Sequence, residues 1–256
     1  MSCPPPTPSS LIPDTLAAER INLFVTGKYN IINDWLQTMR PGVDQPQSMT
    51  YTPTQFQYLY NLLLQVPGIA GVKVYFANYV PNPPVTDPYI PAGMEYFLTI
   101  LFAATDGDMK DTGDYYVVDN SANPPTPSVK KFQDATIPLS WINYYQQNIL
   151  PLLQADGQQS NPAFLETKTI FYTMEDLAGW ISIINCSGQP GNPVINGVEW
   201  SFATYGPDEE YANQLGQVIT LTALNTDSNA RVKTLSGGGG GNYDTGSPCP
   251  PDDICN

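Results

Sequence analysis

Two segments of the chain carry apolar residues at the spacing of an amphipathic helix, and each segment opens with a residue suited to cap it. Thr52 is followed by a proline and then by Gln55, which predicts an N-cap with a capping box. Thr173 takes the corresponding position in the second segment, with Glu175 and Asp176 favourably placed in the first helical turn. The expected buried stripes are Phe56, Leu59, Tyr60 and Leu63 in the first helix and Leu177, Trp180, Ile181 and Ile184 in the second.

A period of two, typical of half-buried strands, follows each of these helices. The apolar face carries Val72, Val74 and Phe76 within residues 71–79, and Val198, Trp200 and Phe202 within residues 197–205. On the opposite face Lys73 corresponds to Glu199. A pseudo-twofold arrangement would bring these two charges together, although two unrelated, solvated charges are the simpler expectation. Further strands are expected at 49–51, 96–104, 170–172 and 218–224.

Two longer helical patterns precede these units. Asp14 is placed to cap a helix that runs to Trp35 with an interruption near Gly27, and the Arg-Pro-Gly at 40–42 ends it. Ser140 is placed to cap the second helix, which Pro151 is expected to kink or end.

The same short passages recur in the same order along the chain. Residues 50–56 match 171–177, residues 71–79 match 197–205, and residues 98–106 match 219–227. A period of this length indicates duplicated domains, since solenoid repeats are much shorter. The sequence therefore predicts an α+β fold of two tandem, pseudo-equivalent lobes, each in the order helix, strand, helix, strand, strand. Chance similarity between amphipathic segments is the alternative.

This interpretation divides the chain into four parts. The first repeat covers 14–120 and the second covers 121–234, between a flexible N-terminal tail at 1–13 and a C-terminal tail at 235–256. The C-terminal tail opens with a run of glycines, which behaves as a flexible tether, and ends in a short acidic piece rich in cysteine and proline.

The amino-acid composition makes some classes of partner and of catalytic chemistry less favourable. The chain has 24 acidic and 10 basic residues, a formal charge of −14, which disfavours nucleic acid and anionic membrane surfaces as partners. No apolar run is long enough to span a bilayer. The chain has no histidine and therefore lacks the usual general base and the commonest metal ligand. No catalytic residue, cofactor or metal is assigned, and residues 1–6 show no secretory signal, so a cytoplasmic location is expected.

The four cysteines are Cys3, Cys186, Cys249 and Cys255. Cys249 and Cys255 are spaced more widely than the paired ligands of a zinc site. A local disulfide between them is expected in an oxidising compartment, and free thiols are expected in a reducing one. A zinc site built from all four thiols would need distant segments to converge.

Three further groups of residues are candidates for chemistry. Asp106, Asp108 and Asp111 lie in an acidic stretch that fits a solvated turn, with a calcium site as the alternative. The carboxylates at 208–210 lack an identifiable catalytic partner. Tyrosines cluster at Tyr58 and Tyr60, Tyr115 and Tyr116, and Tyr144 and Tyr145, a pattern that suits a protein-binding surface or core packing.

The absence of histidine, the duplication and the cysteine-bearing tails favour a non-enzymatic protein that binds a protein partner or assembles with itself. The alternative is a histidine-independent enzyme that uses carboxylates or tyrosines in a cleft between the lobes.

Overall fold

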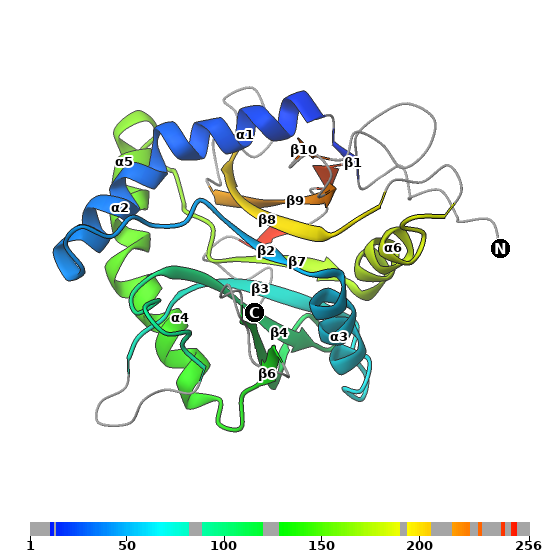
Figure 1. The fold of residues 1–256 in the computed structure, drawn as a ribbon. Coiled ribbons are helices and arrows are strands. Elements are labelled where there is room, and N and C mark those ends of the chain that lie inside the picture. The colour runs from blue at the N-terminus through cyan, green and yellow to red at the C-terminus, as the bar shows by residue number, and fades with distance from the viewer. Residues whose placement is uncertain are drawn as a thin grey trace.

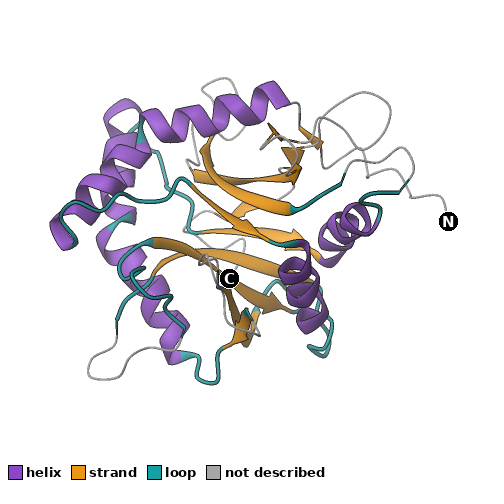
Figure 2. Cartoon of the chain, viewed as in Figure 1, coloured by secondary structure: helices purple, strands orange, loops and turns teal. Residues whose placement is uncertain are grey.

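The described part of the molecule consists of helices packed around two antiparallel sheets, as Figure 1 and Figure 2 show. The computed structural model describes the backbone of residues 11–12, 14–81, 89–119, 128–189, 194–205, 217–225, 230–231, 242–243 and 247–249, and side chains between 15 and 205 within these ranges. The chain is an α+β protein.

The helices are α1 (Asp14–Thr26), α2 (Lys28–Met39), α3 (Pro53–Leu63), α4 (Thr136–Asn148), α5 (Leu150–Ser160) and α6 (Met174–Asn185). The longest of them have 13 residues, and none within the described ranges has the length and apolarity of a membrane-spanning helix. The strands are β1 (Leu11–Ile12), β2 (Ser48–Tyr51), β3 (Gly71–Asn78), β4 (Leu98–Thr105), β5 (Asp111–Val118), β6 (Val129–Lys131), β7 (Thr169–Thr173), β8 (Gly197–Thr204), β9 (Gln217–Asn225), β10 (Ala230–Arg231), β11 (Asn242–Tyr243) and β12 (Ser247–Cys249).

Each sheet combines strands from both halves of the chain. One sheet has the order β1-β11-β9-β8-β2, with β10 also on β9, and the other has the order β12-β7-β3-β4-β5-β6. β2 therefore pairs with β8, and β7 pairs with β3, across the expected boundary at residue 120. Tyr51 lies opposite Val198, and Tyr172 lies opposite Val72. The four-part division of the chain stays a prediction.

The predicted capping box at Thr52 forms, and the predicted N-cap Thr173 also forms one, with Asp176. The Thr52 hydroxyl accepts from the Gln55 amide at 3.2 Å, while the Gln55 side chain accepts from the Thr52 amide at 2.8 Å. In α6 the Thr173 hydroxyl accepts from the Asp176 amide at 3.1 Å, and the Asp176 carboxylate accepts from the Thr173 amide at 2.9 Å. These boxes satisfy amide groups that the first helical turn leaves unpaired.

The prediction of Ser140 as an N-cap is wrong, because α4 begins four residues earlier in the chain at Thr136. The Asp134 carboxylate accepts from the Thr136 amide at 2.8 Å and supplies the missing acceptor at this helix end. That amide holds the pKa of Asp134 below its ordinary value. Ser140 instead lies inside the helix and donates to the Ile137 carbonyl at 2.7 Å. Pro151 marks the break between α4 and α5, as expected.

Several strands lie where the sequence predicted none. β5 and β6 extend the sheet beyond β4. β1, β11 and β12 come from the two expected tails, so part of each tail is paired into a sheet.

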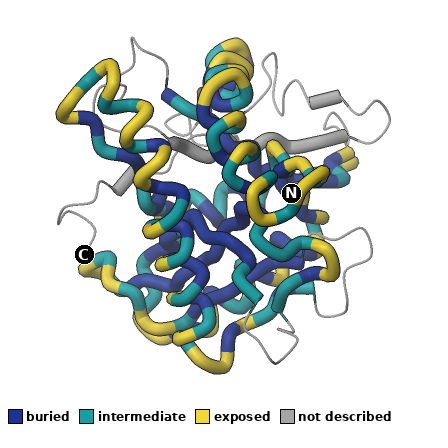
Figure 3. The backbone as a smooth tube through the Cα atoms, turned by 90° about the vertical axis from the view of Figure 1, so that its left-hand side faces the viewer, coloured by how far each residue is buried: buried dark blue, intermediate teal, exposed yellow. Residues whose placement is uncertain are grey.

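The core between the sheets centres on Trp200. Its ring lies 5.2 Å from Phe102, 5.9 Å from Tyr51 and 6.2 Å from Tyr172, measured between centroids. Phe56 of α3 completes this cluster at 6.0 Å. The aromatic side chains thus join both sheets and a helix, and each buries a large apolar area. Figure 3 shows the buried positions gathered in the middle of the molecule.

The helices cover the sheets in a crossed arrangement. α1 packs on β8 and α4 packs on β3, so each of these helices covers a strand from the other half of the chain. α3 and α6 contact each other, and both lie on the right in Figure 1.

A buried ion pair joins the two halves. Lys28, at the start of α2, contacts the carboxylate of Glu166, which is fully buried in the segment between α5 and β7. The second carboxylate oxygen of Glu166 accepts from the Thr167 amide at 3.0 Å. The Lys28 ammonium also lies 5.1 Å from the centre of the Phe164 ring. A buried charge needs such compensation, because water is excluded from it.

We expect Glu166→Gln to lower the free energy of unfolding by about 3–5 kcal/mol, because Lys28 would keep a buried charge without a counter-ion. Asp108→Asn is the matched control, since Asp108 and Lys110 form an exposed pair at 3.6 Å, and such pairs contribute about 0–1 kcal/mol. Urea unfolding of both variants tests this. Equal effects of the two substitutions would contradict it.

Candidate functional site

The densest group of interacting polar side chains described here lies on one face of the β3–β4–β5 sheet. The register places Lys73 opposite Ala103 and Ala103 opposite Tyr115, so a small residue separates two long side chains. A register shift between Ala103 and Thr105 follows, and it brings Asp111 opposite Thr105. The strand register and this irregularity therefore bring four side chains together: Lys73, Tyr75, Asp111 and Tyr115. We call them the Asp111 cluster.

One carboxylate accepts most of the bonds in the Asp111 cluster. Its Oδ2 accepts from the Tyr75 hydroxyl at 2.8 Å and from the Tyr115 hydroxyl at 2.9 Å. The Lys73 ammonium lies 3.5 Å from Oδ1 and is 5% exposed, whereas the Asp111 side chain is 19% exposed. The carboxylate is therefore held between two phenols and a buried cation.

The electrostatics keep both phenols protonated. Burial raises the pKa of Tyr75 and of Tyr115, and the negative charge of Asp111 raises it further. A tyrosine that acts as a general base needs a lowered pKa, so these two phenols serve as hydrogen-bond donors. The Asp111 cluster is arranged to fix the sheet and offers no poised acid–base pair.

The three aspartates of the expected acidic turn have separate partners. The Asp106 carboxylate accepts from the amides of Asp108 and Lys110, both at 2.9 Å, and so closes the turn between β4 and β5. Asp108 pairs with Lys110, while Asp111 belongs to the cluster described above. Within the described ranges no three potential metal ligands converge. The calcium alternative stays untested.

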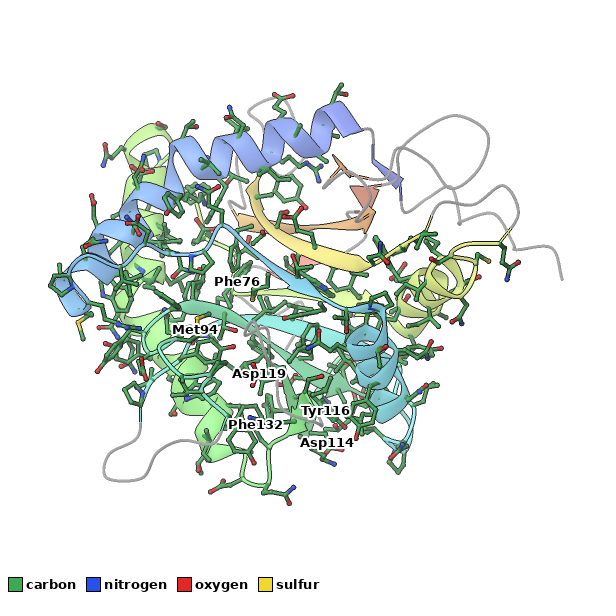
Figure 4. The ribbon with its side chains drawn as sticks, viewed as in Figure 1. Phe76, Met94, Asp114, Tyr116, Asp119 and Phe132 are labelled. Carbon is green, nitrogen blue, oxygen red and sulfur yellow. The ribbon has the colours of Figure 1, made fainter. Side chains whose placement is uncertain are left out.

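A second row of charges follows β5 and β6 in the lower half of Figure 4, where Asp114 and Asp119 are labelled. Lys131 pairs with Asp114 at 2.6 Å, and Lys130 lies 3.8 Å from the buried Asp119. Burial, followed by the charge of Asp114, raises the pKa of Tyr116 to about 12. These pairs again neutralise each other across neighbouring strands.

Two grooves open between helices. The first, of about 380 Å³, lies between α3 and α6 and is lined by Pro53, Thr54, Gln57, Tyr58, Asn61, Ile184 and Asn185. The second, of about 450 Å³, follows the junction of α4 and α5 and is lined by Gln146, Gln147, Leu150, Pro151, Gln154, Ala155, Gln158 and Lys168. Neither lining contains a carboxylate, so both grooves suit binding through amides better than acid–base chemistry.

Other predicted positions are dispersed. Lys73 lies on β3 with Asp111, whereas Glu199 lies on β8 in the other sheet and accepts from the Ser48 hydroxyl at 2.9 Å. Tyr58 lines the α3–α6 groove, and Tyr145 is fully buried, with its pKa raised by burial and by Glu166. The carboxylates at 208–210 lie outside the described residues.

Cys186, at the end of α6, forms a disulfide whose partner lies outside the described side chains. The side chains of the predicted Cys249–Cys255 pair also lie outside them. Disulfides persist mainly in oxidising surroundings, so the bond at Cys186 makes an oxidising compartment an alternative to the expected cytoplasmic location.

β2 is the last strand of its sheet. The Phe202 amide donates to the Gln47 carbonyl at 3.2 Å, so alternation along β2 turns the peptide groups of Ser48 and Thr50 away from β8. In the part of the chain that the structure describes, no strand pairs with β2 on that outer edge. We call this the β2 edge.

The side of β7 that faces away from β3 is occupied. The Phe76 amide donates to the Lys168 carbonyl at 3.4 Å, so the peptide groups of Thr169 and Phe171 point away from β3. β12 lies against that side, with Ser247 opposite Phe171 and Cys249 opposite Thr169. At the position of Pro248 a backbone N–H would point away from β7. The proline, which has no N–H, therefore removes no hydrogen bond between β12 and β7.

Sequence reasoning missed the Asp111 cluster, the second groove and the open edge. Lys73 and Tyr75 stand two positions apart on one strand face, and this signal was available. The glutamines flanking Pro151 were a second signal. Which strand occupies an edge depends on long-range pairing, which local patterns do not contain.

Comparison with known proteins adds no relative: no family model matches the chain, and no match is found among curated proteins or solved structures.

We expect Tyr75→Phe to lower stability by about 1 kcal/mol at neutral pH, because one hydrogen bond to Asp111 is lost. Above pH 10 the stability difference between the variant and the parent should become smaller. The folded-state pKa of Tyr75 lies above the unfolded value of 10.0, so its contribution is complete below that pH and declines as the pH rises. The variant should therefore lose less stability than the parent between about pH 10 and pH 12.

Urea unfolding across this pH range provides the measurement. Tyr58→Phe is the control, since the Tyr58 side chain is 41% exposed and lies outside the Asp111 cluster. Identical pH dependence in Tyr75→Phe and the parent would show that the raised pKa is wrong.

Proposed function

We propose that this chain is an internally duplicated, non-enzymatic assembly protein that joins copies of itself by strand addition. One observation carries the proposal: the C-terminal strand β12 completes the edge of β7, while the corresponding β2 edge has no strand partner in the described part of the chain.

The pairing of the strands supports the duplication. The sequence alignment equates Tyr51 with Tyr172 and Val72 with Val198. The pair Tyr51–Val198 and the pair Tyr172–Val72 are then the same pair, formed once in each sheet. The crossed packing of α1 on β8 and α4 on β3 follows the same relation. Chance similarity of amphipathic segments gives no reason for reciprocal register.

Under this relation β2 and β7 are counterparts, and so are their outer edges. Each chain then has two acceptor edges but one donor, Ser247–Cys249. We therefore assign the β2 edge to the C-terminal strand of a second copy, which would leave β7 of its own chain to bind there. Strand addition of this kind gains its affinity from main-chain hydrogen bonds.

The enzyme alternative has less support. The charged groups of the Asp111 cluster already satisfy one another, and its phenols are held protonated. The two described grooves are lined without a carboxylate. A catalytic site needs groups poised near the operating pH.

Thr50→Pro tests the β2 edge. Proline removes the Thr50 amide donor, which points away from β8, and so leaves the β2–β8 ladder intact. We expect self-association of the full chain, followed by light scattering across a concentration series, to weaken about ten-fold in this variant. Thr50→Val is the control, because it keeps the donor and should associate like the parent.

Deleting residues 236–256 removes the donor strand and should abolish association. Adding a synthetic peptide of residues 242–256 to the truncated chain should then produce a complex of two peptides per chain, one on β7 and one on the β2 edge. A full chain that stays monomeric at all concentrations, or equal association in Thr50→Pro and Thr50→Val, would contradict the proposal.

A further inference from the structure

The groove at the junction of α4 and α5 contains a cation among uncharged amides. Gln146, Gln147 and Gln154 line it, together with Lys168 from the segment that leads into β7. Leu150 and Pro151 contribute apolar surface. Binding sites commonly combine an apolar surface with a few placed polar groups of this kind.

Lys168 differs from the other cations of the described chain. Lys28, Arg40, Lys73, Lys110, Lys130 and Lys131 each pair with a carboxylate, and Arg20 lies 4.7 Å from the centre of the Tyr205 ring. Within the described residues, Lys168 alone has no recorded ion pair or aromatic contact. In a chain of net charge −14, a cation without an acidic neighbour in a groove is available to an external anion.

Hydrogen bonds and burial hold several of the residues that line this groove in place. The Lys168 carbonyl accepts from the Phe76 amide at 3.4 Å, which attaches this segment to β3. Gln158 donates to the Phe164 carbonyl at 3.1 Å, so this side chain is held by the backbone. Leu150 is buried beneath the groove. A ligand would therefore meet walls that are already ordered, which reduces the entropy lost on binding.

We infer that this groove binds the C-terminal carboxylate of a peptide. The Lys168 ammonium would pair with the carboxylate, and the Gln146, Gln147 and Gln154 carboxamides would donate to and accept from the adjacent peptide groups. The strongly negative net charge disfavours polyanions, whereas a single carboxylate beside neutral amides needs only one cation. This inference is independent of the strand-addition proposal, because the groove residues lie outside β2 and β12.

Binding of N-acetyl-triglycine to the full chain, followed by chemical-shift changes in NMR spectra, tests the inference. We expect saturable binding of the free carboxylate and at least about ten-fold weaker binding of the C-terminal amide of the same peptide. Lys168→Gln should remove this preference for the carboxylate. Lys110→Gln, which changes a lysine in the β4–β5 turn outside the groove, should bind like the parent.

Equal binding of the carboxylate and the amide would overturn the inference, as would an unchanged preference in Lys168→Gln or no saturable binding. Inorganic phosphate that binds more tightly than the peptide would also overturn it, because the site would then be a general anion site. Thr50→Pro should bind the peptide normally, so failure of the strand-addition proposal remains distinguishable.

Discussion

The pairing of β2 with β8 and of β7 with β3 is the constraint on which the rest of the structure depends. Because these strands come from opposite halves of the chain, neither sheet can be completed by one half alone. The core also combines both halves of the chain. Trp200 packs against Tyr51 and Phe102 from the first half and against Tyr172 from the second half. Burial of these rings requires both strand pairs to be in register.

The buried charges of the described chain are matched locally by opposite charges and hydrogen-bond partners. Lys28 with Glu166, and Lys73 with Asp111 and its two phenols, are networks in which each member has a partner. Networks of this kind stabilise a unique arrangement when they are satisfied. The β2 edge and the groove beside Pro151 differ from them, because each presents polar groups outward that pair with no other strand or charge among the described residues.

Most local signals in the sequence predicted elements that form, although the N-cap expected at Ser140 was wrong. The N-caps at Thr52 and Thr173 and the alternation around Val74 and Trp200 predicted helices and strands that form. β5 was missed because its first four residues are polar or glycine and obscure the period of two. The Asp111 cluster and the β2 edge were missed for another reason: both arise from pairing between distant strands, and no single segment contains that information.

The crossed pairing also dictates the order in which a newly synthesised chain can mature. β3 leaves the ribosome well before β7, which pairs with one of its edges. This edge of β3 therefore stays unpaired until the second half of the chain has been synthesised. Contacts between such distant positions form slowly, because the intervening loop has to close first. This protein is therefore most prone to misassembly during translation. At that stage the unpaired edge of β3 can bind a chaperone or a neighbouring nascent chain.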